Sequence, residues 1–157
     1  NSFSQMKRIE LFHRSFDQIT KGHEAIVKRG LKLFDEIIVA VGINSNKQNF
    51  FDLEKRKQMV AQTFKSHKNV RIETYEGLTI DFCKKMKANF ILRGLRSNAD
   101  FEYETNIAQM NSALSPTIET VFILTSPELS AISSTVVRDV LRYNGNAAQF
   151  LPQNVRV

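Results

Sequence analysis

The chain has 157 residues, of which 42% are hydrophobic, and a formal net charge of +6 from 22 basic and 16 acidic side chains. This length and apolar content suit one globular domain with a substantial core, and the chain lacks the run of about eighteen apolar residues that a membrane-spanning helix needs. The single cysteine, Cys83, excludes a disulfide framework and fits a reducing cytoplasm, and with three histidines at unrelated spacings it indicates no structural metal site.

Residues 1–5 are expected to be the remnant of an expression tag, and residues 6–157 a single domain. A first strand is predicted over residues 8–12, although Glu10 is unexpected there because burial of a carboxylate is costly. Apolar residues at helical spacing then predict a helix over residues 22–34.

Strands and helices continue to alternate along the rest of the chain. The elements predicted in order are a buried strand over 36–42, a helix over 53–64 capped by Asp52, a strand over 70–74, a helix that contains Cys83, a strand over 90–92, a long helix to about 114, a strand over 121–124, and a helix over 133–143 with Gly145 just past its end. Such alternation favours a Rossmann-like α/β fold, a doubly wound five-stranded parallel sheet with helices on both faces.

In such a sheet, ligands bind at the carboxyl ends of the strands, where the winding reverses. If the reversal lies between the first and fourth strands, the loops 15–23 and 93–96 face each other. Gly22 and His23 fall in the first turn of the predicted helix, where free N–H groups and the helix dipole favour an anion. His23 can also donate to a phosphate oxygen, and we therefore expect phosphate chemistry on a nucleotide.

Two further segments carry side chains that suit phosphates. Arg93 and Arg96 offer guanidinium groups at a strand end, although ion pairs with acids such as Asp100, Glu102 or Glu104 explain them equally well. The hydroxyls of Ser133, Ser134 and Thr135 lie at the start of a predicted helix, and Arg138 follows one turn later. A helix cap needs only one hydroxyl, so three exceed that need. Lys47 lies in a polar loop and on its own is expected to be solvent-exposed.

Several of these segments match one known family. Thr20-x-Gly22-His23 resembles the T/H-x-G-H signature of the nucleotidyltransferase superfamily, and Ser15-Phe16-Asp17 resembles the turn before it in bacterial phosphopantetheine adenylyltransferases. Residues 132–138 resemble the superfamily's I-S-S-[ST]-x-x-[KR] signature. Residues 93–96, 100–104, 108–111 and 150–155 are characteristic of the phosphopantetheine enzymes within the superfamily.

The resemblance implies transfer of the adenylyl group of Mg-ATP to 4′-phosphopantetheine, giving dephospho-coenzyme A and pyrophosphate, by a homohexamer that needs Mg²⁺ but no protein metal ligand, nucleic acid or membrane. It implies that His23 stabilises the transition state, with Lys47 and Arg96 as further catalytic residues. The implied contacts to phosphopantetheine are Ser15, Lys47, Thr79 and Arg93, and those to ATP are Ser15, Phe16, His23, Gly94, Leu95, Arg96, Glu104, Leu129, Ser130, Ala131, Ile132, Ser133, Ser134 and Thr135.

The first loop departs from the family pattern. His13-Arg14 stands where the family has Pro-Gly, Gln18 where it has Pro, and Glu10 where it has a small apolar residue. The Arg14 side chain must swing away, fill part of the ATP site or bind a phosphate itself, and loss of both prolines is expected to loosen the loop. We therefore expect reduced turnover.

Three other functions remain open on the sequence alone. Another adenylyl- or cytidylyltransferase would share the His23 motif, but less readily the segments around Tyr103 and Leu151. A nucleotide- or coenzyme-A-binding protein with little activity would explain the unusual first loop. Nucleic-acid binding would need a clustered basic face, whereas the basic residues are spread along the chain.

Overall fold

The computed structural model describes residues 6–157, so the predicted tag remnant at 1–5 lies outside the described residues. A five-stranded sheet in the order β3-β2-β1-β4-β5 forms the centre of the molecule, and all of its pairings are parallel. The strands are β1 (Ile9–Arg14), β2 (Glu36–Gly42), β3 (Val70–Tyr75), β4 (Phe90–Leu95) and β5 (Glu119–Leu124). The Rossmann-like doubly wound fold predicted from the alternation is confirmed, with the winding reversing between β1 and β4.

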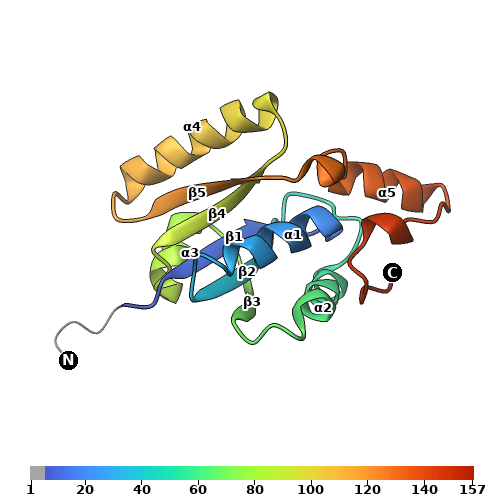
Figure 1. The fold of residues 1–157 in the computed structure, drawn as a ribbon, viewed down its shortest axis with the longest axis horizontal. Coiled ribbons are helices and arrows are strands. Elements are labelled where there is room, and N and C mark those ends of the chain that lie inside the picture. Colours follow the sequence, from blue (N-terminus) through green and yellow to red (C-terminus); the bar gives the residue numbers. More distant parts are fainter. Residues whose placement is uncertain (1–5) are drawn as a thin grey trace.

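Helices cover both faces of this sheet (Figure 1). They are α1 (Lys21–Gly30), α2 (Leu53–Phe64), α3 (Thr79–Met86), α4 (Asn98–Leu114) and α5 (Ser134–Arg142), with short 3-10 turns η1 (Pro127–Leu129) and η2 (Ala148–Phe150). None of the helices in the part of the chain described is long and apolar enough to cross a membrane.

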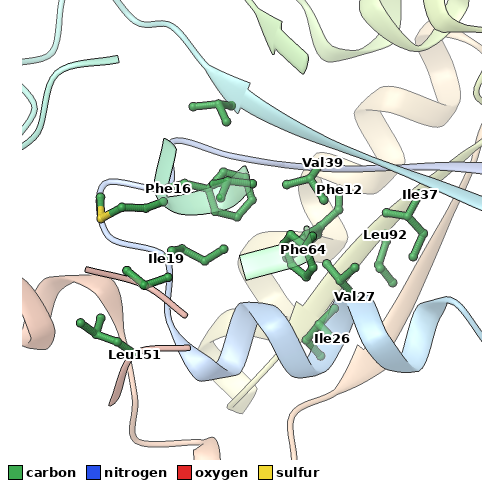
Figure 2. Packing of buried hydrophobic residues seen from close by; sticks show 14 of the residues in the cluster. Phe12, Phe16, Ile19, Ile26, Val27, Ile37, Val39, Phe64, Leu92 and Leu151 are labelled. Carbon is green, nitrogen blue, oxygen red and sulfur yellow. The ribbon is translucent and has the colours of Figure 1, made fainter. Parts of the chain in front are cut away.

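Two hydrophobic clusters, one on each face of the sheet, join the strands to the helices. Phe12, Val27 and Leu92 belong to the larger cluster, which joins the sheet to α1, α2 and the C-terminal segment (Figure 2). Alternate strand residues such as Leu11 belong to the other cluster with Cys83 of α3. Burial raises the pKa of the Cys83 thiol to about 12, so this cysteine stays a neutral thiol at neutral pH.

The strands that flank the winding reversal are longer than predicted. β1 continues to Arg14 rather than ending at Phe12, because residues 13 and 14 stay in register with Ala40 and Val41 of β2. β4 continues to Leu95 rather than ending near Leu92. The residues expected in the two loops therefore project from rigid strand ends.

The first helix is shorter than predicted. α1 ends at Gly30, where a Cβ atom would lie 2.9 Å from Ile37 Cδ1 and 3.1 Å from a Glu10 carboxylate oxygen. Glycine thus allows the end of the helix to pack directly on the sheet. The chain then turns, so that Leu33, which the helix predicted over 22–34 would have included, lies outside α1 and is 49% exposed. Phe34 returns to the core, where its ring lies 5.0 Å from that of Phe90.

Glu10 is fully buried in β1, and neither carboxylate oxygen has a hydrogen-bond partner among the described residues. Burial raises the pKa of this carboxyl from 4.5 to about 8, so the group is mostly protonated at neutral pH. Glu10 therefore avoids the penalty of a buried charge by staying protonated, not by forming an ion pair.

Candidate active site

Two cavities open beside each other at the carboxyl ends of the central strands. We call the first, of about 280 Å³, the His23 pocket; its walls include Ser15, Phe16, Gly22, His23, Gly94, Arg96, Asp100, Glu104, Thr125, Ile132–Thr135 and Arg138. We call the second, of about 630 Å³, the Tyr75 pocket; its walls include His13, Asn44, Ser45, Asn46, Tyr75, Glu76, Arg93, Tyr103 and Ile107. Arg14, Ser15 and Lys47 line both pockets, so two ligands bound there would meet at these residues.

His23 is fixed by a hydrogen bond to the start of its own helix. Thr20 is the N-cap of α1, and its hydroxyl accepts a hydrogen bond from the main-chain N–H of His23. In return, the main-chain N–H of Thr20 donates to Nδ1 of the His23 ring over 3.1 Å. Because a main-chain N–H can only donate, Nδ1 must be the unprotonated nitrogen of a neutral ring. Nε2 therefore carries the proton, and His23 presents an N–H donor to the pocket.

The surroundings of His23 keep the ring neutral. Its ring lies edge-on to Phe16, 5.3 Å between centroids, and burial together with the positive charges of Arg14 and Arg96 lowers the pKa of His23 to about 3. Phe16 itself takes the left-handed conformation at φ 51°, which turns the first loop beneath the histidine. His23 can thus donate a hydrogen bond across the working pH range but cannot act as a cationic acid.

Both arginines of the 93–96 segment form ion pairs, as the alternative interpretation of the sequence predicted. Arg93 Nε and Nη2 donate to the two oxygens of Glu104 over 2.8 and 2.6 Å, with both side chains buried. Arg96 Nε lies 3.3 Å from a carboxylate oxygen of Asp100 in a half-exposed pair. Arg93 is therefore held rigidly, whereas Arg96 has the freedom to turn toward a ligand.

The three hydroxyls at the start of α5 have different partners. Ser133 caps the helix by accepting from the N–H of Val136, Ser134 donates to the carbonyl of Gln18, and Thr135 accepts from Arg138. Only the first of these bonds is an ordinary cap, and the second ties α5 to the first loop. This explains why the sequence has more hydroxyls here than one cap needs.

The first loop is held at several points despite the loss of both family prolines. The carboxylate of Asp17 accepts from the N–H groups of Phe50 and Phe51. Its carbonyl accepts from Arg138, and the carbonyl of Ser15 accepts from the buried Arg56. These bonds argue against the loose loop expected from the sequence.

The other departures in this loop are also ordered. His13 Nδ1 lies 3.0 Å from the Tyr75 hydroxyl, and Gln18 is fully buried with its amide donating to the carbonyl of Ile19. Burial and the neighbouring Arg93 and Arg14 keep the pKa of His13 well below its usual range. Arg14 ends a regular strand, and its φ lies outside the left-handed region, so the backbone there does not require glycine.

Comparison with known proteins matches residues 11–140 to the cytidylyltransferase-like family model. A phosphopantetheine adenylyltransferase from Flavobacterium johnsoniae is 55% identical over 150 residues, covering 96% of this chain and 98% of that protein. The corresponding protein of Flavobacterium psychrophilum is 52% identical, covering 96% of this chain and 99% of its own. The chain belongs to the phosphopantetheine adenylyltransferase family.

A solved structure with the same fold is the bifunctional NMN adenylyltransferase/ADP ribose pyrophosphatase from Francisella tularensis. It superposes with a TM-score of 0.74 at 18% identity, over 95% of this chain and 46% of that longer chain. This likeness confirms the nucleotidyltransferase fold and carries no information about substrate.

Most of the ATP contacts that the family resemblance implies line the His23 pocket, and four do not. Leu95 is buried within β4, Leu129 faces a separate cavity beside the C-terminal segment, and Ser130 and Ala131 form the turn before α5. Of the implied phosphopantetheine contacts, Ser15, Lys47 and Arg93 line the Tyr75 pocket. Thr79 lies behind Tyr75, with its hydroxyl 3.5 Å from the tyrosine hydroxyl.

Sequence reasoning missed the residues that close the Tyr75 pocket. Residues 44–46 follow β2, and their place at the carboxyl end of a central strand was the available signal. Tyr103 and Ile107 come from α4, which the Arg93–Glu104 ion pair and the contact of Phe101 with Phe122 join to β4 and β5. Within residues 6–157, no three histidine, cysteine or acidic side chains gather where they could hold a metal ion.

Proposed function

We propose that this chain transfers the adenylyl group of Mg-ATP to 4′-phosphopantetheine, forming dephospho-coenzyme A and pyrophosphate. The observation that carries the proposal is the pair of adjoining pockets that share Arg14, Ser15 and Lys47. The His23 pocket suits the nucleotide, because it combines the N-terminus of α1 with a fixed N–H donor and Arg96. The Tyr75 pocket suits the second substrate, whose phosphate would reach the shared residues.

In this reaction an oxygen of the 4′-phosphate attacks the α-phosphorus of ATP, and the bond from that phosphorus to the bridging oxygen of pyrophosphate breaks. The chain needs no covalent nucleophile, because positioning and charge stabilisation account for most of the catalysis in such transfers. His23 Nε2–H would donate to an α-phosphate oxygen as charge builds up there, while Lys47 and Arg96 would stabilise the phosphates on either side.

Mg²⁺ would reach the site on the phosphates of ATP, where it offsets their charge. The carboxylates of the His23 pocket are already engaged, Glu104 by Arg93 and Asp100 by Arg96. These residues therefore suit a metal that the nucleotide carries better than one held by the protein.

We also propose that turnover is reduced and that the Arg14 side chain is the cause. The first loop is well fastened, but the Arg14 side chain lies in both pockets, between the places where the reacting phosphates would lie. A side chain there would separate the two phosphates. If Arg14 kept the two phosphates apart completely, the chain would bind nucleotide with little activity, which is the alternative function.

From family membership we also propose that the protein is a homohexamer located in the cytoplasm. We propose in addition that it has no nucleic-acid or membrane partner. The surface of α4 supports self-association. Among the described residues of this helix only Glu104 is buried, whereas Phe101, Tyr103, Met110 and Leu114 are 51–66% exposed. Light scattering on a sizing column would test the oligomer.

The function itself is tested by incubating the protein with ATP, Mg²⁺ and 4′-phosphopantetheine while following pyrophosphate. We expect release that depends on both the metal and phosphopantetheine. Glycerol 3-phosphate with CTP and nicotinamide mononucleotide with ATP serve as control pairs, and neither should support release. Comparable turnover with a control pair would overturn the substrate assignment, and binding of ATP without any release would favour the binding-protein alternative.

A further inference from the structure

Arg14 stands at the junction of the two pockets. It is the last residue of β1, and its side chain lines both the His23 pocket and the Tyr75 pocket while remaining 30% exposed. The sequence left open whether this side chain swings away, fills the site or binds a phosphate. Its place in the walls of both cavities excludes the first of these.

Within residues 6–157, the guanidinium of Arg14 makes no hydrogen bond. Its Nε is buried without a partner, and its closest acidic neighbour is Glu104, with 3.6 Å from Nη1 to Oε1. Both oxygens of Glu104 already accept from Arg93. The other arginines of these pockets have closer partners: Arg93 donates hydrogen bonds to Glu104, and Arg138 donates to the first loop. Arg96 forms an ion pair with Asp100 over 3.3 Å.

Arg14 also keeps its charge in this position. Burial and the positive charge of Arg93 lower the pKa of Arg14 to about 10, which still leaves the group protonated at neutral pH. Glu104 opposes this lowering but is shared with Arg93. A charged, partly buried fork of donors without a hydrogen-bonding partner is costly, and an anion placed against it would remove the cost.

We propose that Arg14 is a ligand for the phosphates of the nucleotide that binds in the His23 pocket. This inference rests on the proposed function for the identity of the nucleotide. The position of the side chain favours this pocket over its neighbour, because Nη1 of Arg14 lies 3.6 Å from Glu104, which lines only the His23 pocket of the two. Arg96 and Arg138 also line this pocket and add positive charge for a phosphate. Binding energy realised before the transition state raises affinity for ATP without raising turnover.

The test is titration calorimetry with Mg-ATP and with adenosine, without phosphopantetheine, on the full chain and three variants. We expect Arg14→Ala to raise the Kd for ATP by about tenfold or more, the loss typical of a hydrogen bond to a charged group, and to leave adenosine binding unchanged. Arg14→Lys should fall in between. Arg8→Ala, which removes an exposed arginine just before β1, is the matched control and should bind ATP like the parent chain.

Opposite results have clear meanings. If Arg14→Ala binds both ATP and adenosine more tightly, the side chain fills space and the proposal is wrong. A separate titration with 4′-phosphopantetheine alone tests the other pocket: if Arg14→Ala weakens that binding but not ATP binding, Arg14 belongs to the second substrate and the assignment fails. Thermal melting of each variant shows whether it is folded. Because ATP binding is measured without turnover, a parent chain that binds ATP through Arg14 yet releases no pyrophosphate would refute the proposed function and leave this inference standing.

Discussion

The main-chain N–H of Thr20 donates to Nδ1 of His23 over 3.1 Å, and the same pair closes the N-terminus of α1. One contact therefore performs two tasks, since it satisfies a free donor at the helix start and fixes the histidine as the Nε2–H tautomer. The position of His23 in the first turn, rather than its residue type alone, makes it a hydrogen-bond donor toward a phosphate.

Replacement of His23 by alanine should lower kcat by about a hundredfold or more with a modest change in ATP affinity, because the lost donor acts mainly in the transition state. Steady-state kinetics of pyrophosphate release measures both quantities. His67→Ala, which removes a histidine outside both pockets, is the matched control. Parent-like kcat in the His23 variant would show that this histidine is structural.

The pH profile of kcat should show no ionisation of His23 between pH 5 and pH 8, because burial lowers its pKa to about 3. The same pKa shift makes the free energy of unfolding depend on pH. The unfolded imidazole binds a proton near pH 6.5 while the folded ring does so only near 3, so this group removes stability as the pH falls between these values. A kcat inflection near pH 6.5 that vanishes in the His23→Gln variant would contradict the neutral donor.

Replacement of Glu10 by alanine should stabilise the protein at pH 8 and remove part of its pH dependence. The folded pKa of about 8 lies above the unfolded 4.5, so the contribution of Glu10 is intact below pH 4.5 and is lost as the pH rises through 8, by up to about 1.4 kcal/mol per pH unit. Urea unfolding at pH 5 and pH 8 measures this. Glu10→Gln should flatten the slope as well, whereas the exposed control Glu54→Gln should not. An unchanged slope in Glu10→Ala would disprove the raised pKa.

Replacement of Glu104 by alanine should lower the free energy of unfolding by about 3–5 kcal/mol, because it leaves Arg93 buried without its partner. The double variant Arg93→Met, Glu104→Leu should recover most of that loss, since no unpaired charge remains. Asp100→Ala breaks the half-exposed pair with Arg96 and should cost about 1 kcal/mol or less. Equal losses for Glu104→Ala and Asp100→Ala would show that the buried pair is not special.

Restoring the family residues His13→Pro, Arg14→Gly and Gln18→Pro together should raise kcat by roughly tenfold, or about 1.4 kcal/mol of barrier. The structure adds that Arg14→Gly alone should give most of this gain and raise the KM for ATP, because the loop is fastened by Asp17 and Arg56 without the prolines. The double variant His13→Pro, Gln18→Pro serves as the comparison. If that pair gives the larger gain, loop rigidity rather than Arg14 limits turnover.

The order of elements could be predicted from the sequence, whereas the strand ends next to the site could not. The apolar run of β2 and the Asp52 cap of α2 carry their own local signals. His13, Arg14 and Arg93 are polar or charged and read as loop, but hydrogen bonding to neighbouring strands extends β1 and β4 through them.

The sequence by itself determined the fold class, the place of the site and the candidate groups at His23, Arg93, Arg96 and the hydroxyls before α5, because periodicity, helix starts and motif spacing are local properties of the chain. Only the tertiary structure decided which partner each group has. It paired Arg93 with Glu104, held the first loop without its prolines and left the Arg14 guanidinium without a hydrogen bond between two cavities. These outcomes depend on distances between segments that are far apart in the sequence. The packing of α4 and α5 against the sheet determines those distances.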